Sequence, residues 1–131
     1  MRRSFVVKAL VAVVIAGHGA AASASAAELP APARLEVDGL LTALGTSDCR
    51  FYRNGQWYGG MEAQEHLRMK YDYLKGRLSS TEEFIKEAAT QSSLSGEPYQ
   101  VKCPNQPAQP SAVWLGERLR ERRTARQDTR S

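Results

Sequence analysis

The chain has 131 residues and a formal net charge of +4, and 42% of its residues are hydrophobic, which suits one domain with a modest core. The basic excess is not a sign of nucleic-acid binding. Arg2, Arg3 and Lys8 lie in a segment that we expect to be removed, which leaves a charge of +1. Six arginines gather in 117–131 while the mature chain before them is slightly acidic, so the uniform basic surface of a nucleic-acid binder is not predicted.

The N-terminus has the order of a secretory signal peptide. Three positive charges in 1–8 precede an apolar run over 9–16, and small residues follow up to Ala26. We expect cleavage after Ala26 or Ala27, which makes 1–26 a signal peptide and the mature protein an exported one. The run is shorter than the roughly 20 apolar residues of a spanning helix, so no membrane span is expected after cleavage.

The mature chain should begin with an extended lead-in over 27–33, where two prolines are separated by one residue. A helix is predicted to follow and to end near Gly45, because leucines recur at approximately helical spacing. The apolar stripe of this predicted helix consists of Leu35, Leu40, Leu41 and Leu44.

The clearest local signal is a β-hairpin over 49–58. Asn-Gly at 54–55 lies between two aromatic-rich segments. This dipeptide suits a type I′ turn, because both central residues of that turn need a positive φ. Side chains alternate between the faces of a strand, so Phe51 and Arg53 are expected on one face and Tyr52 on the other.

Two more helices are predicted after the hairpin. The first covers 61–78, and its inward face consists of Ala63, Leu67, Tyr71, Leu74 and Leu78. The second runs to about Gln91, and Ser80 followed by Glu83 has the spacing of a capping box at its start. Its apolar face consists of Phe84, Ile85, Ala88 and Ala89.

The last part of the chain is predicted to hold one strand and one helix. Residues 99–103 alternate as a strand does. A proline-broken loop over 104–110 follows, and Ser111 is the expected N-cap of a final helix. The apolar stripe of that helix is Ala112, Leu115 and Leu119, with Trp114 at its edge. We expect a frayed basic tail over 123–131.

The two cysteines, Cys49 and Cys103, both lie in the mature part. In an exported protein an even number of cysteines indicates a disulfide. By loop-closure entropy this disulfide would contribute roughly 4 kcal/mol. The alternatives are a zinc site with His66 and a carboxylate, or a redox-active thiol. The sequence has neither the closely spaced ligand pairs of a zinc site nor the CxxC spacing of a redox-active site.

These elements predict a single α+β domain over 34–122. A small antiparallel sheet, made of the hairpin and a third strand, is expected to pack against about four helices, with one disulfide joining the hairpin to the third strand. A fold of this size gains much of its stability from such a covalent link.

Three segments together carry a resemblance to a known family. They read CRFYRNGQWYGGMEAQEHLRMKYDYL, TEEFIKEAATQSSLSGEPYQVKC and SAVWLGERL. In this order they resemble a family of small exported bacterial proteins catalogued as a domain of unknown function, the one numbered 5329, over about residues 34–122. The resemblance implies a periplasmic location and the disulfide, and it implies no activity for any position.

The candidate catalytic residues are few. His66 is the single histidine after cleavage, and it suits a general base that activates Ser93 or Ser95 in a small hydrolase. No Gly-x-Ser-x-Gly elbow or orienting acid accompanies it. A packing histidine is the simpler interpretation.

The candidate binding residues lie in the hairpin and the helix after it. Arg53, Asn54 and Lys70 suit a small anion site near the hairpin tip, or, in the simpler interpretation, Asn54 serves only the turn and Arg53 is a solvated strand end. Aromatic residues are frequent at recognition sites, and Trp57, Tyr58 and Tyr71 are the aromatic members of the proposed surface. The domain's other tyrosines of note are Tyr52, Tyr73 and Tyr99.

Two further features allow a binding role as well as a structural one. The turn Ser92-Ser93-Leu94-Ser95-Gly96 can cradle an anion with its amides, or can simply end a helix with Gly96 in the left-handed conformation. The arginine-rich end can touch lipid headgroups or an acidic partner, or remain a solvated helix.

We therefore predict a non-catalytic periplasmic binding or adaptor module for an unidentified protein or small ligand. No cofactor, metal or nucleic acid is predicted, and the hydrolase is the alternative.

Overall fold

The computed structural model describes residues 11–14, 16, 17, 19 and 28–131. Most of the predicted signal peptide, and its cleavage site, lie outside the described residues, so the signal peptide stays a prediction. None of the described helices is long and apolar enough to cross a membrane.

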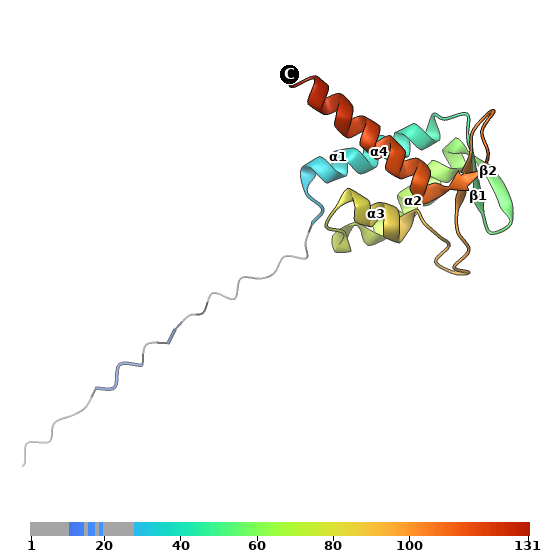
Figure 1. The fold of residues 1–131 in the computed structure, drawn as a ribbon. Helices are drawn as coiled ribbons and strands as arrows, with labels where there is room; N and C mark the ends of the chain where they lie inside the picture. Colours follow the sequence, from blue (N-terminus) through green and yellow to red (C-terminus); the bar gives the residue numbers. More distant parts are fainter. Residues whose placement is uncertain (1–10, 15, 18, 20–27) are drawn as a thin grey trace, which may run out of the picture.

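Within residues 28–131 four α-helices, one short 3₁₀ helix and a four-stranded sheet make up the fold (Figure 1). In chain order the elements are α1 (Ala31–Gly45), β1 (Arg50–Arg53), β2 (Gln56–Gly59), α2 (Gly60–Leu74), η1 (Lys75–Arg77), α3 (Thr81–Ala88), β3 (Gln100–Lys102), β4 (Gln109–Pro110) and α4 (Ser111–Asp128). The predicted α+β class, with helices packed on a small antiparallel sheet, is confirmed. The short strand β4 lies in the segment that we expected to be a loop.

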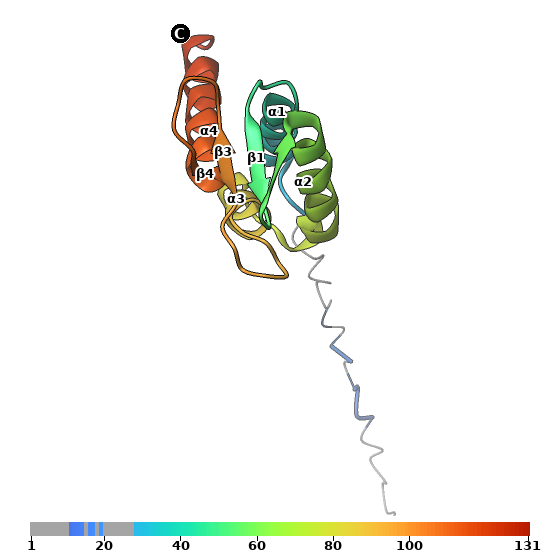
Figure 2. The same ribbon diagram turned by 90° about the vertical axis from the view of Figure 1, so that its right-hand side faces the viewer.

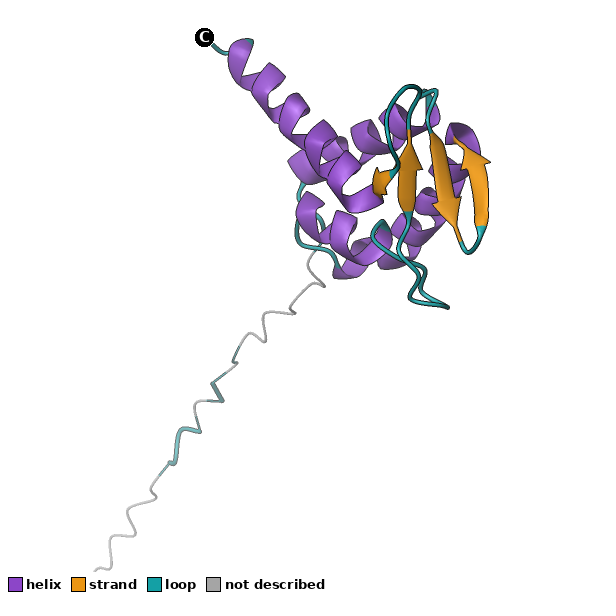
Figure 3. Ribbon diagram, turned by 45° about the vertical axis from the view of Figure 1, so that its right-hand side comes forward, coloured by secondary structure: helices purple, strands orange, loops and turns teal. Residues whose placement is uncertain are grey.

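The sheet has the strand order β2-β1-β3-β4, with each neighbouring pair antiparallel, and the helices lie to one side of it (Figures 2 and 3). Phe51 pairs with Val101 across β1 and β3, and both side chains are buried against the helices. Tyr52 pairs with Trp57 on the opposite face, where their ring centroids lie 5.2 Å apart. The alternation predicted from the sequence therefore sets which face meets the core.

The hairpin turn between β1 and β2 has the predicted conformation. Asn54 has φ 48° and Gly55 has φ 84°, which are the two positive angles that a type I′ turn needs. After β2 the chain enters α2 at Gly60, where a Cβ atom would lie 2.4 Å from the carbonyl oxygen of Leu44. Because only glycine fits there, α2 can start close against the end of α1.

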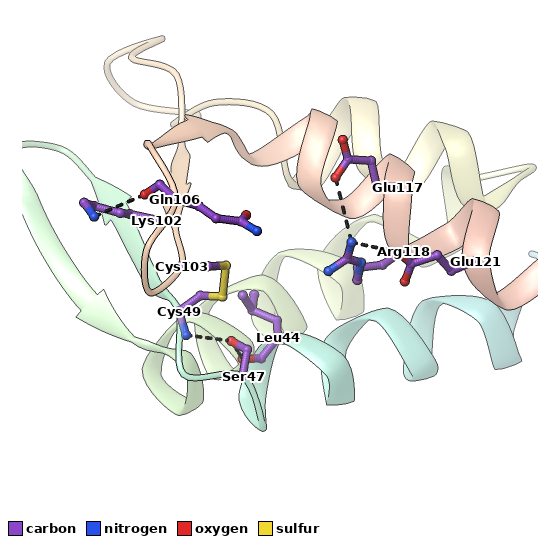
Figure 4. Close-up of a disulfide and its surroundings, with 9 residues drawn as sticks. All are labelled: Leu44, Ser47, Cys49, Lys102, Cys103, Gln106, Glu117, Arg118 and Glu121. Atoms are coloured by element: carbon purple, nitrogen blue, oxygen red, sulfur yellow. Dashed lines mark hydrogen bonds and ion pairs between the residues drawn. A yellow bond between two sulfur atoms is a disulfide. The ribbon is translucent and has the colours of Figure 1, made fainter.

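The disulfide between Cys49 and Cys103 is present, as predicted (Figure 4). Arg50 pairs with Lys102 in the sheet, so the cysteine before β1 and the cysteine after β3 occupy the next register position. The bond therefore joins β1 to β3 at the end of the sheet opposite the hairpin turn.

The start of α1 differs from the prediction. The helix begins at Ala31, so the expected extended lead-in over 27–33 is wrong for its last three residues. Pro32 lies in the first helical turn. Backbone N–H groups there have no partner within the helix, so the missing N–H of a proline costs no helical hydrogen bond. The predicted stripe also needs one correction: Leu35 is 71% exposed, while Val37 is fully buried.

The ends of α2 and α3 come earlier than predicted. α2 ends at Leu74 and gives way to η1, although Leu78 is still buried, as its place in the stripe indicated. α3 ends at Ala88 rather than near Gln91. Its continuation is prevented because the backbone of Thr90 accepts a hydrogen bond from the amide of Tyr99, which draws residues 90–91 alongside the approach to β3. The predicted cap is present, since Ser80 Oγ accepts from the amide of Glu83 at 3.1 Å.

Helix α4 is longer and better anchored than predicted. Ser111 is its first residue rather than its N-cap, and the buried Ser111 Oγ has no hydrogen-bond partner in the described part of the chain. Trp114, expected at the edge, is buried. The helix continues to Asp128, so the predicted frayed tail from 123 is wrong. The reason is an interaction with α1: Arg123 and Arg126 both bind the carboxylate of Glu36.

Candidate functional site

The candidate site begins with two side chains at the hairpin end of the sheet. Arg53 lies two residues after Phe51, and Tyr99 lies two residues before Val101. Since side chains alternate along a strand, both project to the face that packs on the helices. β1 and β3 are antiparallel, so Arg53 and Tyr99 meet at the same end of the sheet. His66 stands over them on α2.

Helix α2 supplies two neighbouring groups. His66 and Lys70 are four residues apart and therefore share one face of the helix. Arg53 Nη1 lies 3.1 Å from His66 Nδ1, and His66 Nε2 lies 3.0 Å from the hydroxyl oxygen of Tyr99. Lys70 Nζ donates to the same hydroxyl at 3.2 Å and to the carbonyl oxygen of Gln91 at 3.0 Å. We call Arg53, His66, Lys70 and Tyr99 the His66 cluster.

The hydrogen bonds determine the protonation of His66. A guanidinium can only donate, so Nδ1 must be the acceptor for Arg53. A neutral imidazole then carries its proton on Nε2 and donates it to Tyr99. The hydroxyl oxygen of Tyr99 thus receives two hydrogen bonds, one from His66 and one from Lys70.

The surroundings favour this neutral form. Burial, and then the positive charges of Arg53 and Lys70, lower the pKa of His66 from 6.5 to about 4. Burial and the charge of Arg53 also lower the pKa of Lys70, and burial raises the pKa of the Tyr99 hydroxyl. His66 is therefore an acceptor for Arg53 and not a third cation at neutral pH.

The two cations of the cluster have no acidic partner among the described residues. Arg53 and Lys70 are half-buried. Within the part of the chain that the structure describes, neither forms an ion pair with a carboxylate. The guanidinium of Arg53 instead lies 5.2 Å from the centroid of the Tyr58 ring. The cluster therefore has an unbalanced positive charge.

Two hollows open beside the cluster and share His66 and Met69. The α2 hollow has a volume of about 380 Å³, and its lining is His66, Met69, Lys70, Tyr73, Leu74, Glu87 and Ser93. The hairpin hollow has a volume of about 360 Å³, and its lining is Phe51, Arg53, Tyr58, Glu62, Ala63, Glu65, His66 and Met69. Each cation of the cluster thus faces an open volume.

The structure brings together three of the six predicted binding residues. Arg53, Tyr58 and Lys70 meet around His66. The other three, Asn54, Trp57 and Tyr71, lie elsewhere. Asn54 accepts a hydrogen bond from a neighbouring loop, Trp57 is on the opposite face of the sheet, and Tyr71 is buried edge-on to a core phenylalanine.

The predicted catalytic pairs are not joined by hydrogen bonds. Ser93 lines the α2 hollow with His66, but in the described part of the chain no hydrogen bond links His66 to Ser93 or Ser95. Ser95 Oγ donates to Asn54 at 2.7 Å instead. Both ring nitrogens of His66 already have partners, so the site contains no histidine poised to take a serine proton.

The serine turn is occupied by its own hydrogen bonds. Ser92 Oγ accepts from the amides of Leu94 and Ser95, and the amide of Gly96 donates to the carbonyl oxygen of Ser92. Gly96 has the left-handed φ of 72°. Because these donors are satisfied internally, the turn offers no open cradle. Among the described residues there is also no group of three or more histidine, cysteine, aspartate or glutamate side chains placed to hold a metal ion.

Sequence reasoning missed a second polar cluster, around Glu36. This carboxylate is 8% exposed and binds Arg123 at 2.8 and 3.1 Å, Arg126, and the hydroxyl of Thr81 at 2.7 Å. The hydrogen bond from Arg123 is the main reason that the pKa of Glu36 falls from 4.5 to about 2. Glu36 precedes Leu40 by four residues on the buried face, and a charge within an apolar stripe is the signal that could have identified it.

The family of unknown function DUF5329 matches residues 31–123, which confirms the resemblance drawn from the sequence. A curated relative, the Uncharacterized protein YfeK of Salmonella typhimurium (strain LT2), is 38% identical over 64 residues, which are 48% of this chain and 53% of the relative. The chain therefore spans about half the length of this relative. No solved structure matches the chain.

Proposed function

The chain belongs to this family of unknown function, and from that premise we propose that it is a non-catalytic binding module whose His66 cluster receives an anionic group. One observation carries the proposal: Arg53 and Lys70 are half-buried and lie around one histidine, and no carboxylate among the described residues pairs with either.

The energetics of the cluster favour an anion. Two positive charges in a partly desolvated site repel each other more strongly than they would in water. Burial is the main reason that the pKa values of His66 and Lys70 are lowered, and the positive charge of Arg53 lowers both further. An anion that accepts from one of these side chains would form a charge-assisted hydrogen bond, which is stronger than a neutral one. Its negative charge would also offset the repulsion between the two cations.

The neutral histidine holds the site together. His66 receives a hydrogen bond from Arg53 on one side and donates to Tyr99 on the other, while Lys70 is tied to Tyr99. Tyr99 is itself 1% exposed and packs 5.0 Å from the Phe51 ring centroid. The two cations are therefore preorganised by the core, which reduces the entropy lost on binding.

We also propose that the protein acts after export, in the periplasm. The N-terminal pattern of charge, apolar run and small residues supports export. The disulfide supports it as well, since disulfides persist in oxidising compartments. Mass spectrometry of the protein recovered from a periplasmic fraction is expected to give a chain that begins at Ala27 or Glu28. A chain that retains Met1 in the cytoplasmic fraction alone would refute export.

Anion binding is tested with small probes at constant ionic strength. Acetate titrated into the protein should shift the NMR signals of His66 and of the Lys70 side chain in a saturable way. Lys70→Gln should weaken this response at least about fivefold, because it removes one charged donor. Lys75→Gln is the matched control, since Lys75 is exposed on η1 and lines neither hollow. A response that is equally weakened by both variants, or no response at all, would refute the proposal.

A further inference from the structure

The wall of the α2 hollow is unusually apolar for a surface. Met69 is 70% exposed and Tyr73 is 74% exposed, and Leu74 lies partly buried beside them. Exposed apolar side chains that gather in one place mark binding surfaces more often than singly scattered ones do. Methionine also adapts its shape to different apolar partners.

The apolar wall and a cation line the same hollow. Lys70 and Tyr73 are three residues apart on α2, as are His66 and Met69, so charge and apolar surface face one volume. Lys70 and His66 form the polar end of the α2 hollow, and both are hydrogen-bonded to the hydroxyl of Tyr99. A ligand that fills the hollow would meet a positive group and an apolar surface together.

From this juxtaposition we infer that the ligand is a monocarboxylate with an apolar body, whose carboxylate binds Lys70 and whose body lies against Met69, Tyr73 and Leu74 in the α2 hollow. The inference rests on the proposed function and names the class of anion. The volume of about 380 Å³ lies at the small end of small-molecule pockets, which are roughly 300 to 1,000 Å³. A compact fatty or aromatic acid therefore suits it.

The acidic residues around the hollows restrict the charge of the ligand. Glu87 lines the α2 hollow, and Glu62 and Glu65 line the hairpin hollow next to it. All three are exposed, and none pairs with Arg53 or Lys70 in the described part of the chain. The lining of the α2 hollow includes one cation, Lys70, and one carboxylate, Glu87, so a monoanion is matched by Lys70, whereas the second charge of a dianion such as a phosphate monoester meets no further cation of that lining and is repelled by Glu87. The site thus favours one negative charge.

The inference is tested by calorimetry and NMR with four probes: acetate, octanoate, octyl phosphate and 1-octanol, each below its aggregation concentration. Octanoate should bind at least about tenfold more tightly than acetate, because its additional methylenes leave water for an apolar wall. It should also bind more tightly than octyl phosphate and octanol.

Each outcome has a distinct meaning. If acetate binds and octanoate binds no more tightly, the inference is wrong and the anion site stands. If octanol binds as tightly as octanoate, or octyl phosphate binds more tightly, the inference is also wrong. If none of the anions binds, both the inference and the proposed function fail.

A matched pair of variants locates the apolar body. Tyr73→Ser should remove most of the advantage of octanoate over acetate while leaving acetate binding nearly unchanged, because Tyr73 lines the α2 hollow and not the hairpin hollow. Met61→Ser is the control, since Met61 is 74% exposed on the same helix and lines neither hollow. Both sites are exposed, so both variants should retain the fold, which thermal unfolding verifies. Equal effects of the two substitutions on octanoate binding would overturn the assignment to the α2 hollow.

Discussion

The two polar clusters of this protein differ in charge balance. At the contact between α1 and α4, the buried carboxylate of Glu36 meets Arg123 and Arg126, so opposite charges satisfy each other. At the hairpin end of the sheet, Arg53 and Lys70 meet a neutral histidine and a tyrosine. The comparison teaches that a charged cluster can complete the fold or remain open to a ligand, depending on whether its own chain supplies the counter-charge.

The positions of the clusters agree with this difference. Arg123 and Arg126 lie on the outer half of α4, which extends away from the body of the domain (Figure 1). Their bonds to Glu36 tie that half of the helix to α1. The His66 cluster instead lies between α2 and the sheet, beside two hollows. One cluster therefore anchors a helix, whereas the other borders open space.

The largest expected effect comes from breaking the balanced cluster. Glu36→Ala should lower the free energy of unfolding by about 2 to 3 kcal/mol, because it removes a buried acceptor from two arginines and from Thr81. Urea unfolding measures this loss. Asp38→Ala is the control, since Asp38 forms an exposed ion pair with Arg68 and should cost less than about 0.5 kcal/mol. Equal losses would contradict a structural role for the Glu36 cluster.

The two clusters should lose their contributions to stability in different pH ranges. The folded pKa of His66, about 4, is below its ordinary value of 6.5, so between these values the unfolded chain binds more protons than the folded one. Stability should therefore fall as the pH falls through this window, by about 1 to 2 kcal/mol between pH 6.5 and 4.5. The pKa of Glu36 falls from 4.5 to about 2, so its contribution is lost only below about pH 4.5.

Urea unfolding at pH 6.5 and pH 4.5 checks the contribution of His66. His66→Gln cannot titrate, so the stability of this variant should change much less between the two pH values. If wild type and variant lose the same stability, the pH dependence belongs to other groups and the account of the His66 cluster is wrong.

The smallest expected effect on stability comes from removing a cation of the open cluster. Arg53→Gln loses a hydrogen bond to His66 but relieves repulsion with Lys70, so unfolding should change by less than about 0.5 kcal/mol. NMR titration should show that the pKa of His66 rises, because the charge of Arg53 helps to lower it. Arg50 lies on the same strand but on the opposite face of the sheet from Arg53, so Arg50→Gln should leave the pKa of His66 unchanged. A similar shift from both variants would contradict the local account.

Much of the fold was predictable because its signals are local. The Asn54-Gly55 turn follows from the φ angles that only a few residues tolerate, and the apolar faces of α2 and α3 follow from helical spacing. The disulfide followed from the number of cysteines and the expected compartment. The helix ends were harder to predict, because hydrogen bonds between distant segments, such as Tyr99 to Thr90, decide where α3 stops.

The candidate site was only partly predictable. Arg53, Lys70 and His66 were each noted as candidate residues, Arg53 and Lys70 for anion binding and His66 for catalysis. Their convergence on Tyr99 was not foreseen, because it depends on the register of β1 with β3 and on how α2 lies over the sheet. Asn54 and Tyr71 were expected at the binding surface, yet a loop contact and the core hold them.

The sequence by itself determined the family, the α+β class, the hairpin and the disulfide, because turn chemistry, periodicity and cysteine number act over short stretches or require no geometry. The tertiary structure alone decided which charges are balanced. Arg123 binds Glu36 across 87 positions of the chain, while Arg53 binds His66 and pairs with no carboxylate among the residues that the structure describes. Long-range packing sets those distances, and Coulomb interactions depend on distance, so a linear sequence leaves them open.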